Sequence, residues 1–335
     1  MGRAALRLFV FLCVLGAIGA TVFLTWGYTQ FVQPGPLVSP TAVVIPKGIG
    51  IHGIAQRLQD AGVVRNATIF RYGVRFLGRK APLRAGEFEF PAAISPRQAM
   101  EVLQQGPTVV RRLTVAEGLT SAEVVDLIAG AEGLSGAVGK VPAEGALLPE
   151  TYHFSFGDPR QQVIARMRQS MAETVDALWA ERTPGLPLKT KRDAVILASI
   201  VEKETAKTEE RPRIAAVFVN RLRKGMKLQS DPTVAYGLAR SGGGLGRPLT
   251  RADLKTPTPF NTYTIDGLPP APICNPGRDA IAAVLRPSQT EELFFVADGT
   301  GGHLFAKTLD EHNRNVAHWR RIQRQRKSGN APQAN

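Results

Sequence analysis

The sequence predicts an α+β protein with one N-terminal transmembrane helix, small strand–helix modules and a mainly helical second half with a small β-hairpin. Three observations support this fold class. An uncharged apolar run lies near the N-terminus, apolar positions then alternate between strand and helix spacing, and helical spacing dominates after residue 145. Apolar residues make up 44% and charged residues 21%. This balance excludes a wholly disordered or fibrous chain.

The first element is the apolar run from Leu8 to Trp26, which contains no charged residue. At ~1.5 Å per residue it is just long enough to cross a hydrocarbon core of about 30 Å. Arg3 and Arg7 precede the run and the next charge is Lys47. We therefore expect a single-pass protein of the inner (cytoplasmic) membrane, with residues 1–7 in the cytoplasm and the rest outside. A cleavable signal peptide is the alternative, but the apolar run continues past the small residues that would be cleaved.

A Pro-rich linker at 27–40 leads into the region 41–144, where one apolar pattern occurs three times. Each copy is predicted to be a strand, a turn near Gly or Pro, and an amphipathic helix. The matching positions are Ile45, Ile49, Ile54 and Leu58; Phe90, Ile94, Ala99 and Leu103; and Val115, Leu119, Val124 and Ile128. The pattern resembles LysM-type glycan-binding units. Coincidence between short amphipathic helices is the alternative.

Residues 145–320 are predicted to form one domain in which helices dominate. Helical spacing and its end signals predict helices over Pro159–Arg182, Lys191–Thr205, Pro212–Lys224 and Arg278–Leu285. A loop-rich segment is expected from Leu228 to Pro276, and a hairpin around the GTGG sequence at 299–302. Residues 321–335 are expected to form a basic, disordered tail.

One carboxylate lies on the apolar face of the helix expected over Lys191–Thr205. At about 100° per residue, Glu204 falls one turn after Ile200, while Glu202 lies at the border of that face. Burial and the negative end of a helix dipole both raise a carboxyl pKa, which suits a general acid at neutral pH. The alternative is that Glu204 begins the exposed helix end or pairs with an arginine such as Arg211.

Several long segments, in order and in register, carry a resemblance to a known family. They are LLPETYHF, LASIVEKET, FVNRLRKGMKLQSDPTVAYG, RADLKTPTPFNTYTIDGLPPAPICNPG and LFFVADGTGGHLFAKTLDEHN. The sequence is similar to the endolytic murein transglycosylases of the YceG-like type. The resemblance implies a LysM-like module, a lysozyme-like helical catalytic domain, and Glu204 as the catalytic acid/base. Polar and aromatic residues in matching motifs are the candidates for substrate binding: Gln229, Asp231, Asn261, Thr262 and Tyr263. Tyr152 and Asn220 are weaker candidates, for which core packing and a helix-surface position are the respective alternatives.

The implied reaction is non-hydrolytic cleavage of the MurNAc–GlcNAc bond within nascent peptidoglycan strands, with formation of 1,6-anhydro-MurNAc. The implied role is the termination of strand elongation, and the expected partners are peptidoglycan strands, the membrane and peptidoglycan synthases. No cofactor is needed. A hydrolytic muramidase is one alternative, for which Asp231 is the visible second carboxylate, although an Asx turn before Pro232 would also explain that residue. A non-catalytic peptidoglycan-binding scaffold is the other.

The net charge of +14 suggests a polyanionic partner. Arg3, Arg7 and the six basic residues after Asn313 contribute eight of these charges, so residues 27–313 carry only +6. This moderate excess suits an anionic wall polymer, and export together with the lack of nucleic-acid-binding motifs argues against nucleic acid. Two cysteines exclude a disulfide framework, and no residue spacing matches a common metal site.

Overall fold

The computed structural model describes residues 2–78, 81–239 and 244–327, and the chain divides into two compact units. The first unit comprises Met1–Arg111, Gly133–Ser135 and His153–Asp158, and the second comprises Arg112–Glu132, Gly136–Tyr152 and Pro159–Asn335. The boundary expected at residue 145 therefore lies too late in the sequence. Residues 112–132 belong to the second unit because buried Asn275 holds them there, through hydrogen bonds to the Leu119 carbonyl and the Ser121 hydroxyl.

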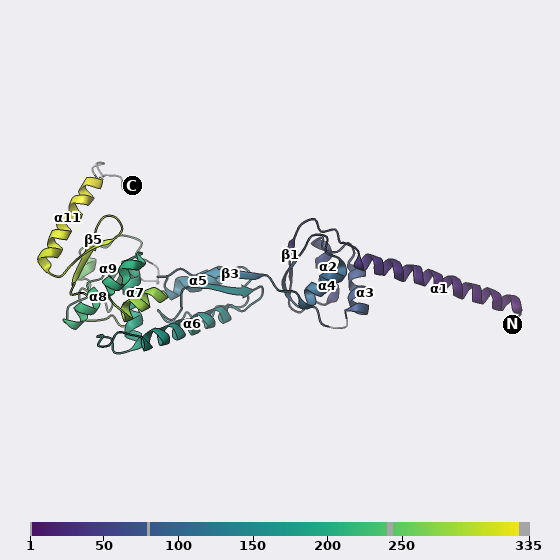
Figure 1. The fold of residues 1–335 in the computed structure, drawn as a ribbon, viewed down its shortest axis with the longest axis horizontal. Coiled ribbons are helices and arrows are strands. Elements are labelled where there is room, and N and C mark those ends of the chain that lie inside the picture. Colours follow the sequence, from purple (N-terminus) through teal and green to yellow (C-terminus); the bar gives the residue numbers. More distant parts are fainter. Residues whose placement is uncertain (1, 79–80, 240–243, 328–335) are drawn as a thin grey trace. The chain divides into compact units, whose positions relative to one another are not determined.

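Helix α1 (Arg3–Val32) begins the first unit and contains the whole predicted membrane span (Figure 1). It is the single helix in the described part of the chain that is long and apolar enough to cross a membrane. Its side chains are exposed as far as Trp26 and become partly buried from Gly27 onward. Phe31 is only 2% exposed and lies in the core of the unit.

The rest of the first unit is built on an antiparallel pair of strands, β1 (Thr41–Ile45) and β2 (Gly86–Phe90), in which Val43 lies opposite Phe88. Helix α2 (Ile51–Asp60) packs against β1, and α4 (Pro96–Gln105) packs against β2. Helix α3 (Ala67–Leu77) was not expected from the sequence. Its start is marked by Asn66, whose side chain accepts hydrogen bonds from two backbone N–H groups of the first turn.

The third strand–helix copy consists of β3 (Val110–Thr114) and α5 (Ser121–Gly130), and β3 pairs with β4 (Thr151–Ser155). All three expected copies are thus strands followed by helices. In each copy the apolar positions are mostly buried, as the spacing requires. The strand–helix pattern is therefore confirmed, whereas a LysM-like glycan-binding role stays a prediction.

Four helices form the core of the second unit: α6 (Arg160–Ala180), α7 (Lys191–Glu204), α8 (Arg211–Arg223) and α10 (Arg278–Leu285) (Figure 1). Each lies within two residues of its predicted bounds. The expected hairpin is formed by β5 (Phe294–Ala297) and β6 (His303–Ala306), joined by the GTGG turn. Two short 3₁₀ helices occur at Thr208–Glu210 and Asp253–Lys255.

Two helices of this unit differ from expectation. Helix α9 (Asp231–Leu238) lies within the segment predicted to be loop, because Asp231 and Pro232 form the first turn of a helix, where Pro is favoured, rather than an Asx turn. Helix α11 (Leu309–Lys327) continues into the predicted disordered tail, so residues 321–327 are helical. Its start is capped reciprocally by Thr308 and Glu311. Residues 328–335 of the predicted tail lie outside the described residues.

Candidate active site

Helix α7 carries the candidate catalytic carboxylate at its last residue. The helix begins with a capping box, in which Thr190 and Asp193 satisfy each other's backbone N–H groups. Every residue from Ala194 to Val201 is buried between α6, α8 and α10. Because the helix is fixed on all sides, the position of Glu204 is set by the core.

Glu204 is half-buried, and its Oε1 accepts a hydrogen bond from the Ser230 hydroxyl. Desolvation, together with a smaller contribution from the negative charge of Asp231, raises the pKa of this carboxyl from its ordinary value of 4.5 to about 7. The Ser230 hydrogen bond and the more distant Arg221 guanidinium oppose that rise. A carboxyl with this pKa is substantially protonated at neutral pH, so it can donate a proton there.

The hydroxyl that contacts Glu204 belongs to a buried network between two loops. Ser230 is 1% exposed, and its N–H donates to the Thr262 hydroxyl at 2.9 Å. The Thr233 hydroxyl donates to the Ser230 carbonyl at 2.7 Å and lies 2.8 Å from the Thr262 hydroxyl. The Gln229 N–H donates to the Thr262 carbonyl at 3.1 Å. The network therefore joins the start of α9 to the 261–263 segment and fixes Ser230 against Glu204.

A second carboxylate, Asp231, lies next to Ser230 at the first position of α9. It is exposed, and one of its oxygens accepts a hydrogen bond from the Tyr263 hydroxyl at 2.6 Å. Burial and the neighbouring negative charges of Asp231 and Glu204 raise the pKa of Tyr263. The phenol therefore stays neutral and remains a hydrogen-bond donor to Asp231.

Two features shape the backbone before Ser230. Gln229 has a φ of +53°, a left-handed conformation that is uncommon for a residue with a side chain, and its side chain is exposed. Arg221 of α8, which is 7% exposed, donates to the Leu228 carbonyl at 2.7 Å and to the Leu293 carbonyl at 2.6 Å. The guanidinium thus holds the loop that presents Gln229 and Ser230.

The sequence analysis did not identify Arg221 and Ser230 as functional residues. The available signal for Ser230 was its position before Asp-Pro, which is typical of the residue that precedes a helix.

Two of the predicted substrate-binding residues are enclosed by protein. Asn261 and Thr262 are both fully buried. The Asn261 amide donates to the carbonyls of Leu254 and Thr256, and its oxygen accepts from the Tyr263 N–H. Their side chains therefore build the loop that carries Tyr263. Of the five predicted substrate-binding residues, Gln229, Asp231 and Tyr263 are those with solvent-accessible side chains.

The other carboxylate of the α7 terminus, Glu202, is held by a positive charge. Arg211 donates to Glu202 at 2.7 Å and to Glu117 at 2.9 Å, and the Gly277 N–H donates to the second Glu202 oxygen at 2.9 Å. The Arg211 and Glu202 side chains are only 6% and 4% exposed. The arginine that sequence analysis weighed as a partner of Glu204 therefore belongs to Glu202.

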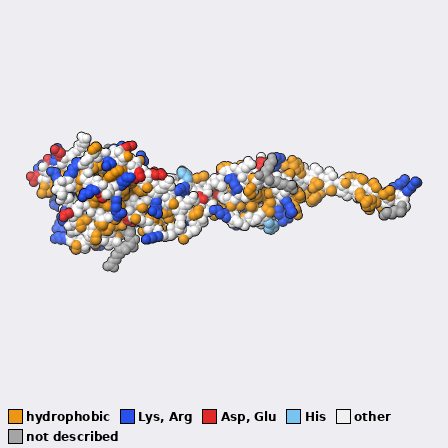
Figure 2. Space-filling view, turned by 90° about the horizontal axis from the view of Figure 1, so that it is seen from below, with side chains coloured by type: hydrophobic (Ala, Val, Ile, Leu, Met, Phe, Trp, Pro, Cys, Tyr) orange, Lys and Arg blue, Asp and Glu red, His pale blue; other side chains and the backbone are white. Residues whose placement is uncertain are grey.

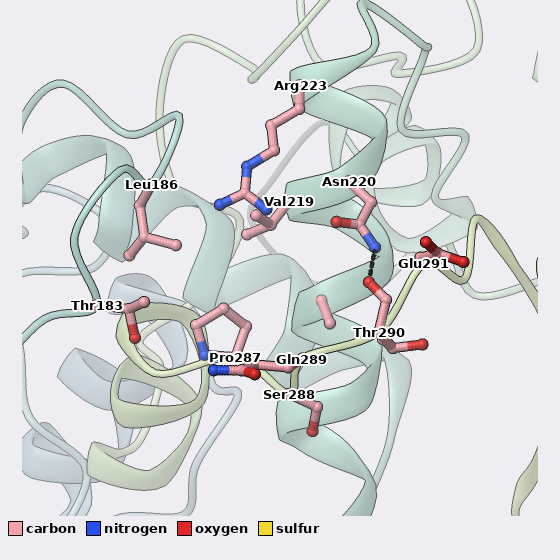
Figure 3. Close-up of a pocket in the computed structure, with 11 residues that line it drawn as sticks. Thr183, Leu186, Val219, Asn220, Arg223, Pro287, Ser288, Gln289, Thr290 and Glu291 are labelled. Atoms are coloured by element: carbon pink, nitrogen blue, oxygen red, sulfur yellow. Dashed lines mark hydrogen bonds between the residues drawn. The ribbon is translucent and has the colours of Figure 1, made fainter.

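A hollow of about 330 Å³ is lined in part by Tyr236 and by Lys203 and Asp231, the chain neighbours of Glu204 and Ser230. A second hollow, of about 360 Å³, lies where α8 meets the 287–291 segment (Figure 3). Asn220 lines this second hollow, and its amide donates to the Thr290 carbonyl at 2.7 Å. The first hollow is the candidate substrate groove, because its lining residues Lys203 and Asp231 directly precede or follow, in the chain, the hydrogen-bonded pair Glu204 and Ser230.

Two weaker site candidates from the sequence have structural contacts. The Asn220 amide anchors the segment before β5, and the buried Tyr152 hydroxyl donates to the Leu148 carbonyl at 2.8 Å. Neither residue lines the hollow that Lys203 and Asp231 line. Their contacts agree with the packing and helix-surface alternatives.

Comparison with known proteins gives one consistent family. The profile of the YceG-like family matches residues 43–318. A protein of Streptococcus pneumoniae named endolytic murein transglycosylase is 29% identical over 320 residues, covering 82% of this chain and 57% of the relative. A Bacillus subtilis protein of the same name is 30% identical over 302 residues, covering 81% of this chain and 82% of the relative.

A crystal structure of a yceG-like protein from Listeria monocytogenes is 31% identical and covers 82% of this chain and 98% of that chain, with a TM-score of 0.52. Of the streptococcal relatives, by contrast, the chain spans just over half the length. The family profile covers most of the chain, including both units and the α7–α9 site. The chain therefore belongs to the YceG-like family.

Proposed function

We propose that this chain is a membrane-anchored lytic transglycosylase that cleaves peptidoglycan strands internally, between MurNAc and GlcNAc. The observation that carries the proposal is the half-buried Glu204 carboxyl, whose pKa of about 7 suits proton transfer at neutral pH. Two similar proteins named endolytic murein transglycosylase support the substrate class. The solvent-accessible side chains of Gln229, Asp231 and Tyr263, on the two loops that meet at Ser230, suit a hydroxyl-rich glycan.

In the first step, protonated Glu204 donates its proton to the glycosidic oxygen as the bond to C1 of MurNAc breaks. The Ser230 hydroxyl donates to Oε1, so the proton that Glu204 transfers resides on Oε2. Positive charge then develops on the MurNAc ring. The Asp231 carboxylate next to Ser230 stabilises that charge, and the Tyr263 hydroxyl holds this carboxylate in place.

In the second step, ionised Glu204 accepts the proton of the MurNAc C6 hydroxyl. That oxygen attacks C1 and closes the 1,6-anhydro ring, so Glu204 is again protonated at the end. A single acid/base suffices because the nucleophile belongs to the substrate. A hydrolase would instead need a second carboxylate as nucleophile or to activate water, and Asp231 is the residue in position to do this.

The proposed roles of the predicted binding residues divide by exposure. Gln229 and Tyr263 contact the glycan, and the left-handed backbone of Gln229 directs its side chain. Buried Asn261 and Thr262 act indirectly, because their hydrogen bonds fix the loop that carries Tyr263 and the hydroxyl that contacts Glu204. Lys203 and Tyr236 extend the groove along the hollow beside Asp231.

We further propose that α1 anchors the chain in the inner membrane as a single span, with Arg3 and Arg7 on the cytoplasmic side. The long exposed apolar helix supports the anchor, and the flanking charges support the orientation. The strand–helix copies of the first unit would bind the same strands in a LysM-like manner. Such a location suits an enzyme that cuts nascent strands near peptidoglycan synthases and so terminates their elongation.

The test is digestion of purified peptidoglycan by the full chain in detergent, with mass spectrometry of the products. We expect strand fragments that end in anhydro-MurNAc, one water lighter than hydrolysed ends. Reducing ends without anhydro sugar would instead identify a muramidase that uses Asp231. Full activity of Glu204→Gln, measured beside Glu209→Gln as a matched control at an exposed carboxyl of the 3₁₀ helix that follows, would refute the assignment of the catalytic acid.

A further inference from the structure

Helix α3 has large apolar side chains that the first unit does not cover. Tyr72, Phe76 and Leu77 are 47%, 65% and 50% exposed. The Tyr72 and Phe76 rings stack on each other, with centroids 6.3 Å apart. The opposite side of the helix supplies fully buried Phe70 to the core. Helix α3 is therefore apolar on two sides, and the protein itself covers only one of them.

Helix α3 also carries positive charge. Between Asp60 and Glu87 the sequence contains six Arg and Lys residues and no acidic residue, and two of the six, Arg71 and Arg75, lie on α3. The Arg71 guanidinium lies over the Tyr72 ring at 5.0 Å from its centroid, and Arg75 is exposed. The ion pairs among the described residues of this unit, Arg97–Glu101 and Arg111–Glu87, involve other arginines, and Arg71 contacts the His52 ring at 3.5 Å. The cations of α3 are thus available to an external anion.

This face lies next to the proposed membrane anchor. Helix α1 packs against α3 and α4. The contact is close, since a Cβ atom added at Gly73 of α3 would lie 2.2 Å from the Phe31 ring of α1. Helix α3 is found at the edge of the first unit from which α1 leaves (Figure 1). Hydrophobic and basic side chains occur together on this part of the unit (Figure 2).

We infer that the exposed face of α3, formed by Arg71, Tyr72, Arg75 and Phe76, lies on the anionic headgroup layer of the membrane that α1 enters. The inference rests on the proposed anchoring by α1. Aromatic rings favour the membrane–water interface, and cations close to the surface are attracted to anionic lipids. A helix with this division of apolar and basic side chains is typical of interfacial binding.

A lipid surface fits these observations better than a protein partner does. Helix α1, against which α3 packs, also has exposed apolar side chains. Contact with lipid would remove the apolar side chains of both helices from water. The charge excess matches anionic headgroups. With two attachments, the helix in the bilayer and the face on its surface, the first unit would be held at the membrane rather than moving freely about the end of α1.

The test uses the full chain in lipid nanodiscs that contain phosphatidylglycerol, with nitroxide labels on single cysteines. Cys274 is fully buried and should not react, so a Cys13→Ser parent provides an unlabelled background. Phe76→Cys in that parent reports on α3, and Gln56→Cys, on the exposed side of α2, is the matched control. Native Cys13, labelled in the unmodified chain, reports on the anchor itself. Collision with oxygen marks lipid, whereas collision with a nickel chelate marks water.

We expect the labels at positions 76 and 13 to be more accessible to oxygen than to nickel, and the label at 56 to be the reverse. If position 13 is in lipid but position 76 matches position 56, the surface inference is wrong while the anchor stands. If position 13 is in water, the anchor and the inference both fail. If position 76 is shielded from both reagents, a protein or a second copy covers α3, and the lipid assignment is overturned.

A second comparison tests the charges. Arg71→Gln with Arg75→Gln should reduce the oxygen preference at position 76 in phosphatidylglycerol nanodiscs. In nanodiscs of phosphatidylcholine alone, the same pair of substitutions should change the label little, because the attraction to anionic headgroups is already absent. An equal change in both lipids would contradict the proposed role of the arginines.

Discussion

Glu202 and Glu204 end the same helix two residues apart, and the protein surrounds them differently. Burial raises the pKa of both carboxyls. At Glu202 a direct ion pair with Arg211 and a backbone N–H oppose the rise, whereas at Glu204 the direct partner is the neutral hydroxyl of Ser230 and Asp231 adds a negative charge. Burial alone therefore does not make a general acid. The partner decides whether a buried carboxyl holds the fold together or exchanges a proton.

The largest effect is expected from Glu204→Gln. Removal of a general acid costs roughly 10²–10⁴-fold in rate, so peptidoglycan cleavage should fall by about that factor. The folded pKa of about 7 lies above the ordinary 4.5, so ionisation of Glu204 opposes folding. Below pH 4.5 the carboxyl is protonated in both the folded and the unfolded chain, so it does not reduce the free energy of unfolding. Above pH 4.5 the unfolded chain releases this proton more readily than the folded chain, so the free energy of unfolding falls until the pH has passed 7. The variant should consequently melt higher than the parent at pH 8 and similarly at pH 4.5.

The control for this result is the parent chain scanned over the same pH values by calorimetry. A variant that loses activity but also melts lower at pH 8 would indicate that Glu204 stabilises the fold. In that case the contrast with Glu202 would disappear.

Arg211→Met should cost stability rather than chemistry. Removing one partner of a buried ion pair leaves the other charge uncompensated, which costs about 3–5 kcal/mol of unfolding free energy. Urea unfolding measures this loss. The double variant Arg211→Met with Glu202→Met should recover much of it, because no isolated charge remains. A large shift in the pH profile of cleavage, with little loss of stability, would assign Arg211 to the catalytic carboxyl instead.

Ser230→Ala should move the alkaline limit of cleavage to higher pH. The Ser230 hydroxyl stabilises the ionised form of Glu204, so its removal raises the pKa of that carboxyl further. More of the enzyme then stays protonated above pH 7, although the rate at lower pH should fall because Oε1 loses its donor. The pH dependence of kcat/KM gives the measurement. A limit that moves to lower pH would show that the hydroxyl does not favour the carboxylate.

Asp231→Asn should produce the smallest shift in the alkaline limit of cleavage, and this shift should be towards lower pH. Loss of a neighbouring negative charge lowers the pKa of Glu204, so activity should decline at lower pH than in the parent. A charge pair in a hydrated site contributes about 1 kcal/mol, which corresponds to about 0.7 pH units. Tyr263→Phe is the matched control, since it removes the hydroxyl that binds Asp231 but keeps the charge. Equal shifts in both variants would indicate a structural effect of the Tyr263–Asp231 contact.

Much of the second unit was predictable because its helices follow local rules. The bounds of α10 agree with the sequence prediction, and the capping box of α7 was visible as Thr190 and Asp193. Helices α9 and α11 were missed for identifiable reasons. The Asp-Pro of α9 was interpreted as a turn, and α11 is so polar that it lacks a clear apolar stripe. The stronger signals were Pro232 in the first turn of α9 and the capping pair Thr308 and Glu311 at the start of α11.

The sequence by itself determined that Glu204 lies on the apolar face of a helix and that α1 is a long uncharged helix, since both follow from the spacing of neighbouring residues. Only the tertiary structure decided which group each carboxylate meets. Glu117, Glu202 and Arg211 come from separate segments, as do Glu204, Ser230 and Thr262. Pairing across such separations depends on how the helices pack. Local periodicity places a side chain on a face but does not identify its partner.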